Sequence, residues 1–157
     1  MPTPTGRARP GDIYAVPLGG SSYAIVKVIY ASRHFRNVIG IGVAPELRHA
    51  SILALDDSHH FDKALLYSAQ ACAQSEWLFL RSEPLSPEET GYSLRLVAGN
   101  VYLEDTLLRK ESPEDRRHLR NMAVAGCGAV INILRDLFSA EPSHPERWRP
   151  PSVRPPG

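Results

Sequence analysis

Apolar and polar residues alternate in short runs over most of the chain, a pattern that predicts many short strands. Residues 12–18 form the first run and contain Pro17, which cannot donate a hydrogen bond within a sheet, so we expect an edge strand or the end of one. The Gly-Gly-Ser-Ser sequence that follows suits a hairpin turn. Residues 23–30 are rich in β-branched and aromatic side chains and predict the return strand, with Lys27 pointing outward.

Further strands are expected in the middle of the chain. Glycines at 40 and 42 indicate a bulge or a close backbone approach in the first of them. The stretch before residue 75 also suits a helix, but the period-two alternation of residues 67–71 favours a strand. Trp77 is expected to anchor a central strand in the core. Strands are thus predicted at residues 36–45, 65–71, 76–80, 94–97 and 101–103, with a loop at 83–92.

The last predicted element is a long helix. Ser112 is an N-cap residue, Pro113 suits the first helical position, and Asp115 follows the cap by three residues. Apolar or small residues then recur at helical spacing, at Leu119, Met122, Gly126, Val130, Ile133 and Leu137. The order of elements predicts an α+β fold, a small strongly bent antiparallel sheet or SH3-like half-barrel with one long C-terminal helix packed on it.

The two ends of the chain differ from its body in composition. Residues 1–10 and 141–157 are rich in Pro and Arg and poor in aliphatic side chains, so they cannot bury enough apolar surface to offset the entropy of ordering. We therefore predict one domain over residues 11–140 between two tails, with Trp148 held loosely.

The charge balance argues against binding to nucleic acid. The tails hold five of the 18 basic and two of the 17 acidic residues, which leaves 13 basic and 15 acidic residues and a net charge of −2 in the body. A nucleic-acid-binding domain usually has a clear basic excess. We expect no nucleic acid among the partners.

Cysteine usage and apolar runs bear on location. Cys72 and Cys127 are far apart and form no C-x-x-C pair, so we expect buried thiols and no disulfide. The chain shows no secretory signal pattern and no apolar run of the roughly 18 residues that a membrane helix needs. The prediction is a cytoplasmic protein that has no membrane partner.

Motifs for catalysis or cofactor binding are hard to find. Residues 56–62 (Asp-Asp-Ser-His-His-Phe-Asp) contain metal-ligating side chains, but their spacing matches no ligand pattern, and the segment suits an exposed acidic loop. There is no G-x-S-x-G nucleophile and no glycine-rich phosphate loop. We expect a non-enzymatic protein that needs no cofactor or metal.

One family resemblance is visible. The chain opens its body with Gly11-Asp12, an aromatic-containing strand that ends in Val-Pro-Leu, a turn, and a strand that begins Tyr23-Ala24. Trp77 leads a strand that is followed by a Pro-Leu turn, and residues 99–119 suit short strands leading into a C-terminal helix. In these features the chain resembles immunity protein family 26 of bacterial polymorphic toxin systems.

The resemblance implies a role as a cytoplasmic antidote, an immunity protein that binds and neutralises a cognate toxin domain. Such binding needs a preorganised surface of about 800 Å² per partner. Two alternatives stay open. The first strand is also similar to that of small-barrel ribonuclease toxins, although the Arg-Pro dipeptide that follows their turn is missing here. A ligand-binding or adaptor barrel is the other alternative.

Clusters of acidic residues are the candidate contact surface for a toxin with basic side chains. These residues have no evident structural role in the sequence, and charges of this kind steer association. The candidates are Asp56, Asp57, Asp62, Glu104 and Asp105.

Overall fold

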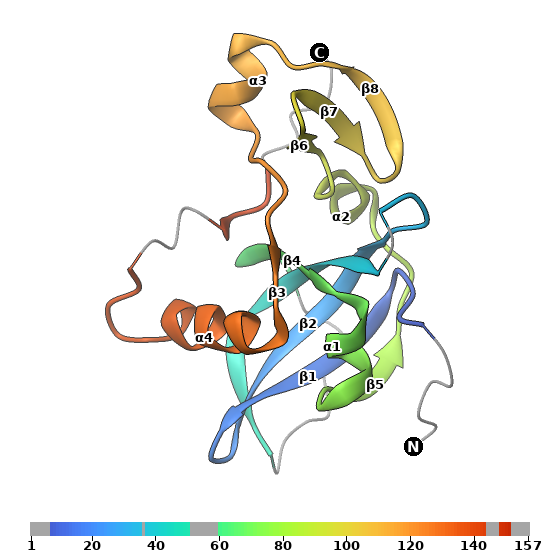
Figure 1. Cartoon of the computed structure of the whole chain (residues 1–157). Helices are drawn as coiled ribbons and strands as arrows, with labels where there is room; N and C mark the ends of the chain where they lie inside the picture. The colour runs from blue at the N-terminus through green and yellow to red at the C-terminus, as the bar shows by residue number, and fades with distance from the viewer. Residues whose placement is uncertain (1–6, 36, 51–59, 144–147, 152–157) are drawn as a thin grey trace.

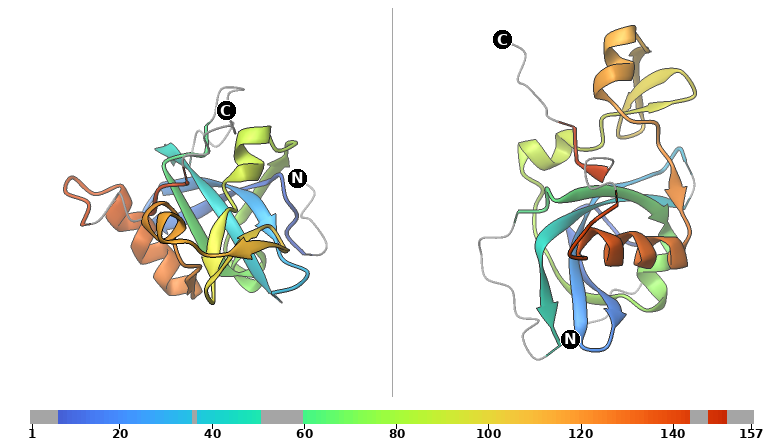
Figure 2. Two further views of the ribbon diagram at one scale, coloured as in Figure 1. Left: turned by 90° about the horizontal axis from the view of Figure 1, so that it is seen from above. Right: turned by 90° about the vertical axis from the view of Figure 1, so that its left-hand side faces the viewer.

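The computed structural model describes residues 7–35, 37–50, 60–143 and 148–151 of the 157-residue chain. These residues form a six-stranded sheet and a three-stranded sheet, with short helices around them (Figure 1). The three-stranded sheet and helix α3 (Pro113–His118) lie together at one end of the molecule, while helix α4 (Cys127–Leu137) lies across the six-stranded sheet (Figure 2). The α+β class is therefore confirmed.

The large sheet has the strand order β5-β1-β2-β3-β4-β9. All neighbouring strands are antiparallel except β4 and β9, so the sheet is mixed and the prediction of a purely antiparallel sheet was wrong. Its strands are β1 (Asp12–Gly19), β2 (Ser22–Ala31), β3 (Val38–His49), β4 (Ala64–Ala69), β5 (Leu78–Ser82) and β9 (Val124–Ala125).

The first strand does not lie at the sheet edge, so of the two positions expected for Pro17 the structure has the one near the end of a strand. β1 pairs with β2 on one side and with β5 on the other, and its side chains are buried on both faces. Pairing with β5 ends at Ala15, two residues before Pro17. Pro17 is tolerated because it lies past the end of that ladder.

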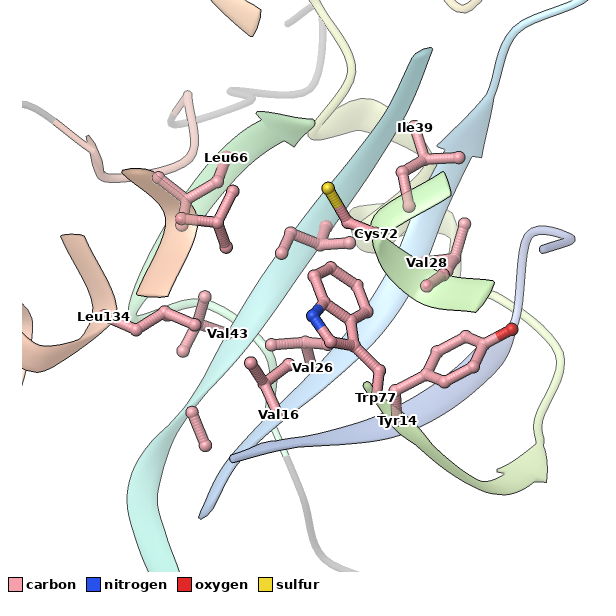
Figure 3. Packing of buried hydrophobic residues seen from close by; sticks show 14 of the residues in the cluster. Tyr14, Val16, Val26, Val28, Ile39, Val43, Leu66, Cys72, Trp77 and Leu134 are labelled. Carbon is pink, nitrogen blue, oxygen red and sulfur yellow. The ribbon is translucent and has the colours of Figure 1, made fainter. Parts of the chain in front are cut away.

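Two hydrophobic clusters, one on each face of the large sheet, explain why the sequence of β1 was interpreted as that of an edge strand with one exposed face. One face of the sheet carries the main cluster, in which Val16, Val26 and Val43 pack with residues of α4 (Figure 3). The opposite face carries a smaller cluster that includes Ile13, Ile25 and Phe61. Strands that are buried on both faces lose the polar positions that would mark an exposed face.

Trp77 is buried in the main cluster, as predicted. Its ring centroid lies 5.9 Å from that of Tyr14, and the two rings meet edge to face (Figure 3). The strand that follows, β5, is an edge strand and not the central strand that we expected. Trp77 reaches the core from the connection between helix α1 (Gln70–Ser75) and β5.

The close approach expected at the glycines of β3 is confirmed. A Cβ atom on Gly42 would lie 2.5 Å from the carbonyl oxygen of Phe61. Only glycine lets the chain before β4 cross β3 at this distance.

Lys27 is buried, whereas the sequence predicted an outward side chain. Its Nζ lies 3.0 Å from Oε1 of Glu89 and 3.1 Å from the carbonyl oxygen of Pro84. Glu89 belongs to helix α2 (Pro87–Gly91), which has Ser86 as its N-cap and occupies part of the predicted loop. The ion pair therefore ties α2 to the second face of the large sheet.

The small sheet has the order β6-β7-β8. β6 (Arg95–Val97) and β7 (Asn100–Leu103) agree with the prediction, and the turn between them has positive φ angles at Ala98 and Gly99. β8 (Thr106–Lys110) was not predicted, because all its side chains are exposed and its two leucines are adjacent. Such a strand has no buried face to mark it in the sequence.

The long C-terminal helix was predicted wrongly. It starts as expected, with a capping box between Ser112 and Asp115, but helix α3 (Pro113–His118) ends there. The chain then runs beside both sheets: the amide of Met122 donates to the Leu96 carbonyl in β6, and β9 pairs with β4. These backbone hydrogen bonds compete with helix formation, and the helix resumes only as α4 (Cys127–Leu137).

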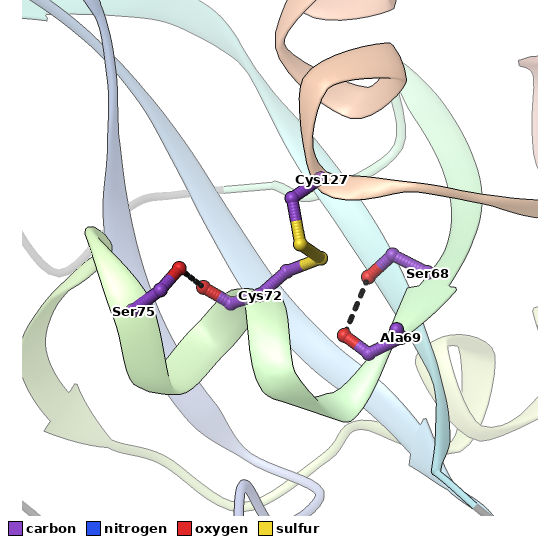
Figure 4. The surroundings of a disulfide bond; sticks show 5 residues. All are labelled: Ser68, Ala69, Cys72, Ser75 and Cys127. Carbon is purple, nitrogen blue, oxygen red and sulfur yellow. Dashed lines mark hydrogen bonds between the residues drawn. A yellow bond between two sulfur atoms is a disulfide. The ribbon is translucent and has the colours of Figure 1, made fainter.

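Cys72 and Cys127 form a disulfide, which overturns the expectation of unpaired thiols. α1 presents Cys72 in the core, and the first residue of α4 presents Cys127 at the surface, so tertiary packing brings together two residues 55 positions apart (Figure 4). Disulfides persist mainly in oxidising compartments. The cytoplasmic location inferred from free thiols therefore loses that support.

Parts of both predicted tails contact the domain. Ala8 is buried in the main cluster, and Trp148 is half-buried against it, so Trp148 is not loosely held. Within the described ranges, no helix is both long and apolar enough to cross a membrane.

Candidate functional site

The three acidic candidates that the structure describes do not form one surface. Asp56 and Asp57 lie outside the described residues. Asp62 is exposed just before β4, while Glu104 and Asp105 form the turn between β7 and β8. The register of β3 and β4 places Asp62 near Val43, whereas Asp105 contacts the loop at the other end of β3. The two groups are therefore separated by the length of the β3–β4 ladder.

Asp105 has a structural role that the sequence did not reveal. Its Oδ1 accepts hydrogen bonds from the hydroxyls of Tyr30 and Ser32, and its Oδ2 accepts from the backbone amides of Arg33 and His34. Burial alone would raise the pKa of Asp105, but these hydrogen bonds outweigh it and hold the pKa below its usual value. Asp105 thus fastens the small sheet to the β2–β3 loop.

Glu104, the neighbouring acid, keeps an exposed side chain and has a positive φ of 54°. Its backbone carbonyl accepts a hydrogen bond of 2.9 Å from Nη1 of Arg95. The turn is therefore held by its backbone, while the carboxylate faces solvent.

Arg95 in β6 is the most unusual polar residue of the described chain. It is 2% exposed, and its guanidinium carbon lies 4.5 Å from the ring centroid of Tyr30, 5.4 Å from that of Tyr67 and 5.7 Å from that of Phe35. Ring faces at these distances attract a cation. Three aromatic side chains from β2, β4 and the β2–β3 loop therefore surround one buried charge.

Hydrogen bonding satisfies only part of this guanidinium. Nη1 donates to the carbonyl oxygens of Ser93 and Glu104, and Nε lies 3.3 Å from the sulfur of Met122. Nη2 is buried without a hydrogen-bond partner among the described residues, and so is the hydroxyl of Tyr67. Burial raises the pKa of Tyr67, more than the nearby Arg95 charge lowers it, so this hydroxyl is a neutral donor.

Arg95 and Tyr67 both line a cavity of about 770 Å³. Apolar side chains of β4, of the chain before β6 and of the C-terminal segment form part of its other walls. Basic side chains come from the end of α3, from the connection after it and from the C-terminal segment. The basic members are His118, Arg120 and Arg149, and the described lining contains no Asp or Glu.

Sequence reasoning missed this site because its members are isolated in the chain. The signal was Arg95 at a position between Leu94 and Leu96, inside an apolar run. A lone arginine in a strand usually points to solvent, and only the contacts of the Arg95 side chain with Tyr30 and Tyr67 show otherwise. In the described ranges, no group of three or more His, Cys, Asp or Glu side chains is placed to hold a metal ion.

The residues that carry the family resemblance have structural roles where they are described. The carbonyl oxygen of Gly11 accepts from the Glu83 amide, and Asp12 accepts from the Arg9 amide and from the Ser82 hydroxyl. These contacts hold β1 against β5. The residues that carry the resemblance therefore support the fold and do not indicate a binding surface.

Comparison of the chain with protein-family models, with curated proteins and with solved structures gave no match. The residues and their geometry are therefore the basis for the function of this protein.

Proposed function

We propose that this protein is an immunity protein, which binds and neutralises the toxin domain of a bacterial polymorphic toxin system. The resemblance of residues 11–24, of the Trp77 region and of residues 99–119 to immunity protein family 26 supports this role. An SH3-like half-barrel and a cytoplasmic location are part of the same proposal, and in the cytoplasm cellular reductants would keep Cys72 and Cys127 as thiols.

One structural observation favours binding to a protein, and it concerns β8. β8 pairs only with β7, so its outer edge has no strand partner among the described residues. Leu107 is 54% exposed and Leu108 is 45% exposed. An unpaired edge with exposed apolar side chains is a template for an added strand from another protein.

The arrangement of β8 suits such an addition. Neighbouring side chains of a strand point to opposite faces, so Leu107 and Leu108 would each contact a different face of the added strand. The turn before β8 presents the exposed carboxylate of Glu104, which is placed to meet a basic side chain of the partner. We therefore assign the toxin contact to Glu104 and β8, since the oxygens of Asp105 are engaged within the chain.

Growth rescue tests the proposal. The C-terminal domain of a toxin encoded directly beside this protein would be expressed in bacteria with and without the protein. We expect growth to be restored by the wild type and lost again with the Leu107→Asp/Leu108→Asp variant. Leu78→Asp is the matched control, because Leu78 is equally exposed (45%) on a different edge strand.

Failure of the wild-type protein to restore growth, or the absence of any such neighbouring toxin gene, would reject the role. Rescue by the β8 variant would reject only the assigned surface. A second function, binding of a small ligand, is favoured by a different observation, the cavity beside Arg95.

A further inference from the structure

Arg95 carries a charge that the described chain does not neutralise. None of the ion pairs among described residues includes Arg95, and its polar contacts are two carbonyl oxygens and one sulfur. Burying a charge is costly unless it is paired, and an arginine cannot lose its proton to escape that cost. The three aromatic rings compensate in part, but they leave Nη2 without an acceptor.

Tyr67 adds a second unused donor in the same wall. Tyr67 is 8% exposed, and its hydroxyl has no partner among the described residues. Buried polar groups of native proteins are nearly always hydrogen-bonded. Two donors without partners, on side chains that line one cavity, indicate an acceptor that the described residues do not supply.

The cavity has the size and lining of a small-molecule site. Its volume of about 770 Å³ falls in the usual range of roughly 300–1,000 Å³. Leu65, Leu66, Leu94, Trp148, Pro150 and Pro151 make its walls mainly apolar. Among the described residues, its ionisable lining is basic apart from the Tyr67 phenol, so a negatively charged occupant is electrostatically favoured.

We propose that this cavity binds a small organic anion, whose flat apolar body packs against Trp148 and whose carboxylate or phosphate accepts hydrogen bonds from Arg95 Nη2 and the Tyr67 hydroxyl. Both donor atoms are buried in this structure, so the two side chains turn toward the anion as it binds. This function goes beyond toxin binding and does not depend on it.

The two parts of the proposed ligand follow from the two parts of the lining. Carboxylate and phosphate oxygens are the usual partners of a guanidinium, and hydrogen bonds to a charged group are stronger than neutral ones. An aromatic ring such as that of Trp148 favours a planar group that can stack on it. An inorganic ion alone would leave the apolar walls unused.

The test is a titration of the full-length, isotopically labelled protein followed by NMR, with the side-chain Nε–H resonance of Arg95 as the reporter. The probes are 2-naphthoate for a carboxylate, adenosine monophosphate for a phosphate, and inorganic phosphate as a bare anion. The uncharged counterparts, 2-naphthamide and adenosine, serve as ligand controls. We expect saturable binding of one organic anion with a Kd below about 1 mM and at least tenfold weaker binding of its uncharged counterpart.

Tyr67→Phe is the decisive variant, because it removes only the unpartnered hydroxyl. We expect its Tm to stay within about 2 °C of the wild type and its affinity for the anion to fall about tenfold. Trp148→Ala should weaken binding by about fivefold or more through lost stacking. Tyr23→Phe, a tyrosine outside the cavity, is the control and should bind as the wild type does.

Three results would each overturn the proposal. They are no saturable binding of either organic anion, equal binding of charged and uncharged probes, and an affinity unaffected by both Tyr67→Phe and Trp148→Ala. Binding of inorganic phosphate as tight as that of adenosine monophosphate would also overturn it, because an adventitious anion needs no apolar site.

Discussion

Asp105, in the turn between β7 and β8, accepts a hydrogen bond from the hydroxyl of Tyr30 in β2, 75 residues earlier in the chain. The ring of Tyr30 also faces the Arg95 guanidinium at 4.5 Å. Tyr30 therefore contacts both Asp105, which attaches the small sheet to the β2–β3 loop, and the buried guanidinium of Arg95. The attachment of the small sheet and the surroundings of the Arg95 guanidinium therefore share one side chain, that of Tyr30.

Replacing Asp105 should loosen this attachment. Asp105→Asn exchanges one carboxylate oxygen for an amide nitrogen that cannot accept the hydrogen bonds of that oxygen. We expect a loss of about 1–3 kcal/mol in the free energy of unfolding, measured by urea denaturation. Glu104→Gln is the matched control in the same turn and should change it by less than about 0.5 kcal/mol. Equal effects of the two variants would contradict the structural role of Asp105.

Acid should destabilise the protein through Asp115 in particular. Hydrogen bonds from Arg109 and from the Ser112 amide lower the pKa of Asp115 from 3.8 to about 2. Because the unfolded chain binds this proton more readily, the stabilising effect of Asp115 is complete above about pH 4 and is lost as the pH falls to about 2. Asp105, whose pKa is also lowered, acts in the same direction.

Urea denaturation at several pH values between about 2 and 5 measures this effect. We expect the free energy of unfolding of the wild type to fall with pH, and a flatter dependence for Asp115→Asn. The same slope in the wild type and the variant would assign the acid sensitivity to other carboxylates.

Trp77 should contribute strongly to stability. It is buried in the main cluster beside Tyr14, so Trp77→Ala would leave a large cavity in the core. We expect a cost of about 3–5 kcal/mol in urea denaturation. Leu78→Ala, at the next and exposed position, should cost less than about 1 kcal/mol. A small effect of Trp77→Ala would place the indole at the surface.

The disulfide should stabilise the junction between α1 and α4. The Cys72→Ala/Cys127→Ala variant loses the constraint on the unfolded chain, and we expect a cost of about 2–4 kcal/mol. Wild-type protein in a reductant should show a matching loss, whereas the variant should not respond to the reductant. Thiol labelling after denaturation without reductant measures pairing directly, and complete labelling of both cysteines would contradict the bond.

The buried pair of Lys27 and Glu89 should be strongly coupled. Glu89→Gln keeps the acceptor of the α2 capping box but leaves the Lys27 charge with one carbonyl and the Phe61 ring. We expect it to cost about 3 kcal/mol, and Lys27→Met to cost less because the remaining Glu89 carboxylate is more exposed than Lys27 and still accepts from the Ser86 amide. A double-mutant cycle by urea denaturation measures the coupling, and additive effects would show that the two charges do not interact.

Local patterns in the sequence were sufficient for several elements. The capping box at Ser112, the turn at Ala98-Gly99 and the strand from Tyr23 all depend on neighbouring residues, and the structure has each of them. Trp77 in the core and the crowded glycines of β3 were also predictable, because large aromatic residues favour burial and a strand glycine indicates close approach.

Tertiary structure alone decided the rest, since the deciding contacts join residues far apart in sequence. β1 became an inner strand because β5 returned to pair with it, and the helical pattern after residue 118 was overridden by hydrogen bonds to β6 and β4. The disulfide between Cys72 and Cys127 likewise depends on packing that brings distant parts of the chain together. In the sequence, Arg95 looks like an ordinary surface arginine of a strand. In the structure, Tyr30 of β2 and Tyr67 of β4 lie around its guanidinium, and this buried charge defines the candidate site.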